Sequence, residues 1–307
     1  MNTLKDTELI LTKDKKIYHL NIDKNQIAND IVLVGDQQRV LQISKHFDKI
    51  ECKIQHREFV THTGIFKGKR ISAISTGIGC DNMDIVVNEL DAVVNVNFDT
   101  RTINIEKKSL NLIRLGTSGS LQKNIKVDSF LLTSHALGFD GLAHFYKNTS
   151  CIDQNMTKAF NNHAKWPTKL SSPYIVKASE SLLNKFGGFT RGITATASGF
   201  YAPQGREIRL KSAIPNMHEI LNSFEYNGNR ITNFEMESSS LYFLGQSLGH
   251  KTLTICAIIG NRINQTQSED YKKTVDELII KVLESIQLSF WKPHLISNLN
   301  FPFGNIF

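Results

Sequence analysis

The sequence predicts a layered α/β fold: one domain with a central, largely parallel sheet. Three observations lead to this prediction. Strand-like and helix-like segments alternate along most of the 307 residues. Several strand-like segments are nearly all apolar, which is typical of strands that are covered on both faces. No internal repeat and no linker rich in Pro, Gly or Ser divides the chain, so we expect a single domain over residues 1–307 with a core at about 18–290.

The first half of the chain predicts two units of strand, glycine turn and helix. Residues 31–35 form a β-branched, apolar run that ends in glycine, and residues 37–47 follow with a helical pattern. Residues 69–76 alternate as a strand does, and after a glycine turn a 3.6-residue period runs through residues 81–96.

The second half continues the alternation. Strands are predicted at residues 111–115, 129–134, 192–197 and 251–259, and helices at residues 236–248 and 270–290. Four residues that include two glycines, 116–119, are expected to end the first of these strands. Gly249 is a favourable residue just past a helix end. The aromatic tail, 291–307, is expected to pack on its own subunit or on a neighbour.

Composition and charge argue against several classes of protein. Hydrophobic residues make up 40% and charged residues 21% of the chain, as in soluble globular proteins. No apolar stretch resembles a signal peptide or a membrane span, so we expect a cytoplasmic protein without a membrane partner. The four cysteines are far apart, which argues against a metal site. The net charge of +7 comes without a dense Lys/Arg run, which favours a small anion over nucleic acid.

Two local patterns suit an anion. Gly35 follows an apolar strand and Arg39 lies one turn later, so backbone N–H groups and a guanidinium could bind an anion, although a tight turn with a surface arginine is the alternative. In the second pattern Arg114 interrupts an apolar strand three residues before Thr117. A buried guanidinium needs an anionic partner, and an internal carboxylate or a bound ligand would serve equally well.

Two further patterns suit a sugar and a heterocyclic base. Glu235 and Glu237 lie where a loop enters a helix, where they could cap the helix or accept hydrogen bonds from the vicinal hydroxyls of a sugar. Phe200 offers a stacking face, while Gln204 donates and accepts and Arg206 only donates. These three side chains complement the two carbonyls and single N–H of uracil, and a surface turn is the alternative.

In this order the patterns resemble the nucleoside phosphorylase I family, and within it the uridine phosphorylase branch. The similarity covers about residues 18–262, and its further anchors are Tyr18-His19-Leu20, HREF from His56, STGIG from Ser75, DG at Asp140 and Gly260-Asn261-Arg262. The resemblance implies a three-layer α/β/α fold with a central mixed sheet. It also implies reversible phosphorolysis of uridine to uracil and ribose 1-phosphate, with deoxyuridine and thymidine left open as substrates.

The resemblance implies a role for each candidate residue. The phosphate site would consist of Gly35, Arg39, Arg114, Thr117 and, from a second subunit, Arg57. The ribose site would consist of Glu235, Met236, Glu237 and, from the second subunit, His19. The base site would consist of Phe200, Gln204, Arg206 and Ile259. Catalysis would rest on Arg206, Gln204, Glu237 and Arg114.

The resemblance also implies partners. Because Arg57 and His19 cross between subunits, the active unit is at least a homodimer, and the family commonly forms hexamers. Phosphate is the co-substrate, and no metal or organic cofactor takes part in the chemistry. Members of the branch sometimes hold a monovalent cation at the positions of Glu58 and Ile78, but Asn82 replaces the usual serine in this chain.

Three alternatives remain open at this point. A purine nucleoside phosphorylase of this fold would use an aspartate where this chain has Asn261, which cannot act as an acid. A hydrolytic nucleosidase would not need Arg39, Arg57 and Arg114 around one phosphate. A non-catalytic nucleoside-binding protein would be expected to have lost a phosphate or ribose ligand, and none is lost.

Overall fold

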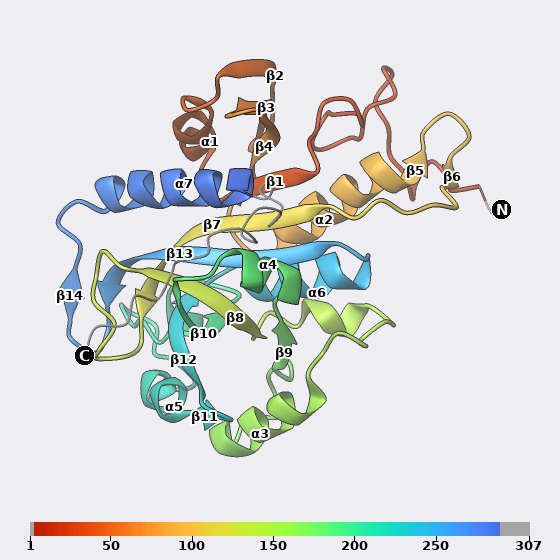
Figure 1. Ribbon diagram of the computed structural model, residues 1–307. Helices are drawn as coiled ribbons and strands as arrows, with labels where there is room; N and C mark the ends of the chain where they lie inside the picture. The colour runs from red at the N-terminus through yellow and green to blue at the C-terminus, as the bar shows by residue number, and fades with distance from the viewer. Residues whose placement is uncertain (1–2, 289–307) are drawn as a thin grey trace, which may run out of the picture.

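The protein, described by a computed structural model for residues 3–288, is built around one extended mixed sheet (Figure 1). Within the described residues the sheet has twelve strands. They are β1 (Asp30–Val34), β2 (Lys49–His56), β3 (Phe59–Phe66), β4 (Lys69–Ser75), β7 (Asn111–Ser120), β8 (Phe130–Gly138), β9 (Tyr174–Lys177), β10 (Thr190–Thr196), β11 (Glu225–Tyr226), β12 (Asn229–Glu235), β13 (Lys251–Asn261) and β14 (Thr266–Gln267). Strands β5 (Val96–Asn97) and β6 (Thr102–Ile103) form a separate ribbon.

The strand order brings segments far apart in the sequence next to one another. The order is β11-β12-β10-β8-β13-β7-β1-β4-β3-β2, with β9 beside β8 and β14 beside β13. Strands β13, β7, β1 and β4 run parallel, as do β8, β10 and β12. The end of β7 also pairs with β12, where Gly119 faces Phe234. Strands β7, β13, β8, β10 and β12 therefore close into a ring.

Helices cover the sheet, as the burial of its strands requires. All five residues of β1 are buried, and because successive side chains point to opposite faces, both faces of this strand must be covered. The helices are α1 (Gln37–Ser44), α2 (Cys80–Asn95), α3 (Gln154–Ala164), α4 (Glu180–Lys185), α5 (Met217–Ser223), α6 (Ser238–Ser247) and α7 (Tyr271–Gln287), with the 3₁₀ turns η1 (Leu142–Phe145) and η2 (Ala202–Gln204).

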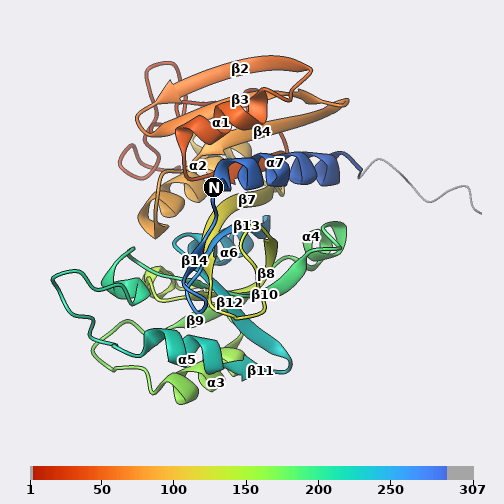
Figure 2. The ribbon, with the colours of Figure 1, turned by 90° about the vertical axis from the view of Figure 1, so that its left-hand side faces the viewer.

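The helices pack in pairs. Helix α2 contacts α6, α1 contacts α7, and α3 contacts α5. Figure 2 shows α3 and α5 together at the bottom of the molecule, beside β11 and β12, while α1 and α7 lie in its upper half. Side chains from β12, α3 and α5 form a second apolar cluster next to the main core. The α/β fold with a mixed sheet is therefore confirmed.

The predicted elements are present, but several of their boundaries are wrong. Strand β8 runs to Gly138, where the predicted strand ended at residue 134, and helix α1 ends at Ser44, where the predicted helix ended at residue 47. Strand β7 continues to Ser120, so residues 116–119 lie within the strand and do not end it. Helix α6 begins at Ser238 and not at Met236, because the Glu235 carboxylate accepts the backbone N–H groups at its start. The predicted helix 270–290 is α7, for which Asp270 is the N-cap. The residues of the aromatic tail, 291–307, lie outside the described residues.

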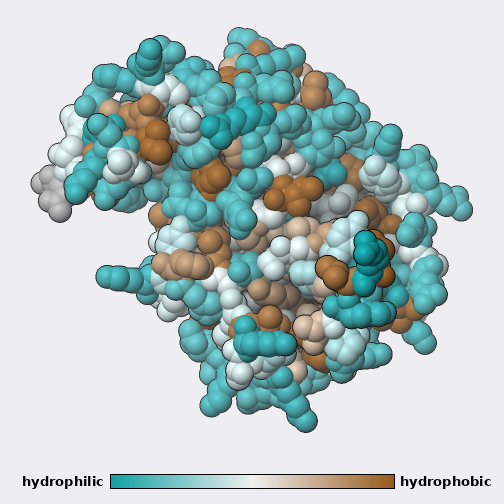
Figure 3. All heavy atoms as spheres, turned by 180° about the vertical axis from the view of Figure 1, so that it is seen from behind, coloured by the Kyte–Doolittle hydropathy of each residue, from teal (hydrophilic) through white to brown (hydrophobic). Residues whose placement is uncertain are grey.

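The surface is mixed in character. Hydrophilic side chains form most of the outline of the face seen from behind, and apolar side chains gather nearer its middle (Figure 3). Among the helices of the described residues, we find none that combines the length and the apolar character needed to cross a bilayer.

Candidate active site

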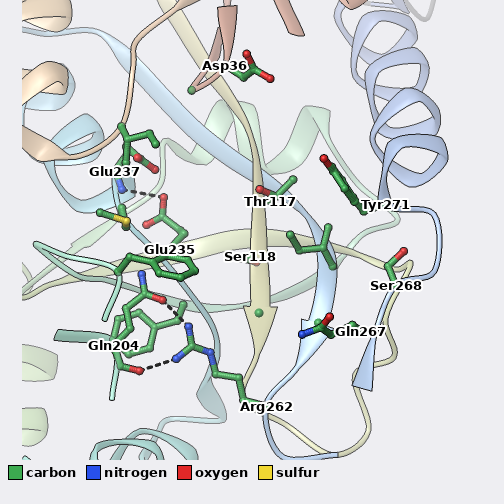
Figure 4. Close-up of a pocket in the computed structure, with 18 of the residues that line it drawn as sticks. Asp36, Thr117, Ser118, Gln204, Glu235, Glu237, Arg262, Gln267, Ser268 and Tyr271 are labelled. Atoms are coloured by element: carbon green, nitrogen blue, oxygen red, sulfur yellow. Dashed lines mark hydrogen bonds between the residues drawn. The ribbon is translucent and has the colours of Figure 1, made fainter. Parts of the chain in front are cut away.

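A cavity of about 1160 Å³ lies where β1, β7, β12 and β13 meet the loops that follow them. Most of the predicted site residues line it: Gly35, Arg39, Arg114, Thr117, Phe200, Gln204, Arg206, Glu235, Met236, Glu237 and Ile259. Glu58 and Ile78, the positions considered for a cation, also line it. Figure 4 shows Glu235 and Glu237 on one side of the cavity and Thr117 and Tyr271 on the other.

The loop from β1 to α1 places the Arg39 guanidinium beside the predicted anion site. Asp36 is the N-cap of α1, and its carboxylate accepts the N–H of Gln38 at 2.9 Å. This cap turns the chain so that Arg39 reaches β7, where its guanidinium lies 3.5 Å from the Leu115 carbonyl oxygen. Burial and the neighbouring Arg114 lower the pKa of Arg39. Two guanidiniums that repel one another in this way favour an anion between them.

Arg114 has the internal carboxylate partners that were one of the two alternatives left open by the sequence. Its side chain, on β7, is buried and forms ion pairs with Glu237 and, at 3.3 Å, with Glu235. Burial lowers the pKa of Arg114, but the two carboxylates outweigh burial and raise it. Gly116 makes room for the guanidinium, since a side chain at that position would collide with it. Because Arg114 also lines the cavity, it can bind a ligand while it is paired.

The two glutamates differ in how much of their hydrogen-bonding capacity is used. Glu235 accepts the N–H groups of Glu237 at 2.9 Å and Ser238 at 3.0 Å, and the hydroxyl of Thr196 at 2.6 Å. It therefore caps α6, which confirms the capping interpretation for this residue. Glu237 accepts the N–H of Gly79 at 2.8 Å and pairs with Arg114. Burial and Glu235 raise the pKa of Glu237, against the opposing effect of Arg114.

The end of the cavity that is lined by Phe200, Gln204 and Arg206, where the sequence predicted a base, is called the base end below. It is rich in hydrogen-bond donors. The Gln204 side-chain oxygen accepts from Arg206 at 2.7 Å and from Arg262, and the Gln204 backbone oxygen accepts from Arg262 at 2.6 Å (Figure 4). With its oxygen held by two guanidiniums, the Gln204 amide is left with its NH₂ group free to donate. Burial lowers the pKa of Arg262, and the neighbouring Arg206 guanidinium lowers it further.

The side chain expected to stack on a base already has a cation on one face. Phe200 is 50% exposed, and the Arg206 guanidinium lies 3.7 Å from the centre of its ring. Arg206 also donates to the Phe200 backbone oxygen at 2.7 Å. A base could stack only on the other face of this ring. Ile259, near the end of β13, lines the same cavity.

Asn261 is occupied by structural hydrogen bonds. Its side-chain NH₂ donates to the backbone oxygens of Gln122 at 2.9 Å and Ile125 at 2.7 Å. Its side-chain oxygen accepts the N–H groups of Ile263 and Asn264. The residue therefore fixes the loop after β13, and it has no proton to give to a ligand.

Two predicted site residues do not line the cavity of their own chain. Arg57 lies at the turn between β2 and β3, where it is exposed and donates to the Tyr18 hydroxyl at 3.0 Å. His19 bonds to Glu89 through Nδ1 at 2.6 Å. His56 bonds to the His19 backbone oxygen at 2.9 Å, which joins both residues into one surface cluster. Glu58, the next residue of the turn, lines the cavity instead.

Several lining residues were not predicted from the sequence as site residues, and Arg262, His218 and Tyr271 are among them. Arg262, which follows the apolar strand β13, could have been found by the rule that located Arg39 and Arg114. His218 reaches the cavity from α5, and no local sequence pattern marks it. Tyr271 is the first residue of α7, and its hydroxyl points into the cavity (Figure 4).

Comparison with known proteins agrees with this architecture. Residues 30–287 match the family model described as the phosphorylase superfamily. The chain is 30% identical to a uridine phosphorylase of Thermococcus kodakarensis over 261 residues, 82% of this chain and 80% of the relative. It is 26% identical to a DeoD-type purine nucleoside phosphorylase of Bacillus subtilis over 271 residues, 87% of this chain and 98% of the relative.

Among solved structures, a Trypanosoma brucei nucleoside phosphorylase described as showing uridine phosphorylase activity superposes with a TM-score of 0.83. It is 28% identical to this chain, and the match covers 92% of this chain and 100% of that structure. The matched residues 30–287 contain every cavity residue described above. A cavity with paired arginines and glutamates, on a chain matched over most of its length, leads to one conclusion: this chain belongs to the phosphorylase superfamily.

Proposed function

We propose that the protein catalyses the reversible phosphorolysis of uridine to uracil and ribose 1-phosphate. The observation that carries this proposal is the donor set at the base end, where Arg206, Arg262 and the Gln204 amide converge and no carboxylate lies among them. A uracil ring that leaves ribose gathers negative charge on N1 and its carbonyl oxygens, and preorganised donors stabilise such charge. The names of the Thermococcus kodakarensis and Trypanosoma brucei relatives support the same substrate.

The ribose and phosphate ends suit the other half of the reaction. Arg39, Arg114 and Thr117 would hold the phosphate, with backbone N–H groups near Gly35. Glu237 would accept a hydrogen bond from the ribose 2′-hydroxyl and so orient the anomeric carbon toward the phosphate, with Met236 beneath the sugar. The phosphate oxygen would attack that carbon with inversion while the base departs. Because charge is stabilised by side chains throughout, the scheme needs no organic cofactor.

We propose that a second copy of the chain completes each site. Arg57 and His19 share one surface cluster outside the cavity of their own chain, so they are free to approach a neighbour's cavity. Arg57 would add a third guanidinium to the phosphate, and His19 would contact the 5′-hydroxyl of ribose. A homodimer is the smallest assembly that satisfies this arrangement.

Subunit complementation tests the shared site. Arg57→Ala and Arg39→Ala each remove one phosphate ligand, and each variant alone should be nearly inactive. A mixed dimer would carry one intact site, so unfolding and refolding the two variants together should restore about a quarter of wild-type activity. Mixing that restores none would contradict the sharing of sites, and an active Arg57→Ala variant would show that Arg57 binds no phosphate.

One assay tests the reaction itself. Uridine is incubated with the full-length protein in the presence and absence of phosphate, and free uracil is measured. We expect release only with phosphate, and the formation of uridine from uracil and ribose 1-phosphate in the reverse direction. Release without phosphate would identify a hydrolase, and no release in either case would identify a binding protein.

Purine nucleosides are the second class to test, since the chain also resembles DeoD-type purine nucleoside phosphorylases. The oxygen and the NH₂ of the Asn261 side-chain amide are committed to four backbone partners, so it cannot supply a proton to a purine ring. We expect inosine to be cleaved far more slowly than uridine under the same conditions. Inosine cleaved at the same rate as uridine would refute the pyrimidine assignment.

A further inference from the structure

The imidazole of His218 lines the cavity at its base end. Its Nε2 atom is 2.8 Å from the Gln204 backbone oxygen and 2.9 Å from the NH1 atom of Arg262. The same NH1 atom donates to the same Gln204 oxygen at 2.6 Å. The three groups therefore form a closed triangle, and His218 touches the two residues that frame the base site.

The chain between Gln204 and Arg206 is shaped to admit this imidazole. Gly205 has a φ angle of +70°, which favours glycine, and a side chain there would begin 2.9 Å from His218 Nε2. Without a side chain at this position, the ring can reach the Gln204 carbonyl. The backbone of the turn that carries Gln204 and Arg206 therefore leaves room for this contact.

The charges around His218 favour its neutral form. Arg262 faces it from β13 and Arg206 from the loop after η2, while Glu219 of its own helix is the one carboxylate that acts on it appreciably. Burial lowers the pKa of His218; the Gln204 carbonyl raises it, and the two guanidiniums lower it again. In the neutral form Nε2–H can donate to the Gln204 oxygen. A protonated ring would instead place a positive charge 2.9 Å from the Arg262 guanidinium.

We propose that His218 is a positioning residue for base recognition: the neutral imidazole donates to the Gln204 backbone oxygen and, being uncharged, lets the Arg262 guanidinium share that oxygen, whereas its protonation displaces Arg262 and weakens the binding of the base. The proposal rests on the proposed function for the identity of the base. It assigns His218 no contact with the substrate. Its effect is therefore expected in the affinity for the nucleoside and in the pH dependence of that affinity.

Calorimetric binding of uridine without phosphate, from pH 5.5 to 8, tests the proposal without interference from the titration of phosphate. The wild-type affinity should fall as the pH falls through the lowered pKa of His218. His218→Gln keeps a side-chain N–H donor and cannot be protonated, so its affinity should stay near the wild-type value at pH 8 and fall less steeply than the wild-type affinity at lower pH. His218→Leu removes the donor and should weaken binding about 10-fold at pH 8.

His144→Gln is the matched control. His144 also bonds a backbone oxygen, that of Ser172 at 2.7 Å, but it does not line the cavity. This variant should keep the wild-type affinity and pH profile. Uridine binding by His218→Leu that equals wild type at pH 8, or a loss of affinity at acidic pH that is as steep in His218→Gln as in wild type, would overturn the proposal.

A measurement without nucleoside separates this proposal from the proposed function. If the wild-type protein binds no uridine at any pH, the proposed function fails. The positioning of His218 is then read from the titration of its ring by NMR, because removal of the guanidinium in Arg262→Met should raise the pKa of His218. An unchanged titration in that variant would contradict the contact between the two side chains.

Discussion

Two arginines at opposite ends of one cavity, the buried Arg114 and the half-buried Arg262, have opposite electrostatic surroundings. Arg114 at the phosphate end is paired with Glu235 and Glu237, and these carboxylates raise its pKa. Arg262 at the base end has only the oxygens of Gln204 and the ring of His218 as hydrogen-bonding neighbours among the described residues, and its pKa is lowered. The positive charge is balanced at one end before any ligand binds and left unbalanced at the other.

The difference indicates at which stage of the proposed reaction each end of the cavity acts. A buried charge without a partner is costly, so an arginine that lacks a carboxylate gains most when a negative charge arrives. At the base end that charge would develop on the departing uracil. At the phosphate end the carboxylates keep Arg114 in place, and Glu237 remains available to the ribose. Under the proposed function, the base end would therefore stabilise the transition state, whereas the phosphate end would be organised before phosphate binds.

Replacing Arg114, the arginine whose charge is balanced by two carboxylates, should have the largest effect. Arg114→Met removes a phosphate ligand and leaves two buried carboxylates unpaired, so we expect activity to fall by more than about 1,000-fold and stability by about 3–5 kcal/mol. Activity is measured by uracil release and stability by urea unfolding. The double variant Arg114→Met with Glu237→Gln should regain part of the stability but no activity. An Arg114→Met protein as stable as wild type would disprove the internal pairing.

Arg206, the half-buried arginine of the base end, should matter for turnover more than for binding. Arg206→Ala removes a donor to the leaving base, and kcat should fall by about 100-fold or more. The Kd of phosphate should change little, since Arg206 lies at the other end of the cavity. Steady-state kinetics and phosphate binding are compared in the same buffer. Near-normal turnover of uridine by this variant would remove Arg206 from the mechanism.

Replacing Arg262, the arginine with the unbalanced charge, should lower activity strongly and stability only slightly. Arg262→Met should lower kcat by about 100-fold, as the loss of one preorganised donor usually does. Its unfolding free energy should change by less than about 1 kcal/mol, because relief of the unbalanced charge offsets the lost hydrogen bonds. Urea unfolding beside Arg114→Met gives the comparison directly. Equal destabilisation of the two variants would abolish the proposed difference between the ends.

The smallest effect is expected from pH at the ribose end. The pKa of Glu237 is raised, so its carboxylate is lost earlier than usual as the pH falls, and ribose binding should weaken with it. The KM of uridine at saturating phosphate should therefore rise several-fold on the acidic side. Deoxyuridine lacks the 2′-hydroxyl and serves as the matched substrate. If its KM rises just as steeply, Glu237 is not the group responsible.

Local sequence signals predicted the scaffold well. The apolar run of β1, the glycine turn after β4 and the helical period of α2 depend on residues that are neighbours in the chain. The ends of a helix or strand were harder to predict where pairing with a strand distant in the sequence extends it. Strand β7 extends through Gly119 because β12 and β13 pair with its far half, which no local pattern reveals.

The sequence by itself determined the alternation of strands and helices and the kinds of chemistry available: guanidiniums after apolar strands, a pair of glutamates before a helix, and a donor-rich turn. The tertiary structure alone decided which of these groups meet. Arg262 reaches Gln204 across 58 residues, and His218 reaches it across 14. The folded arrangement of β12, β13 and α5 brings them together. Charge balance depends on such distances in space, and spacing along the chain does not encode them.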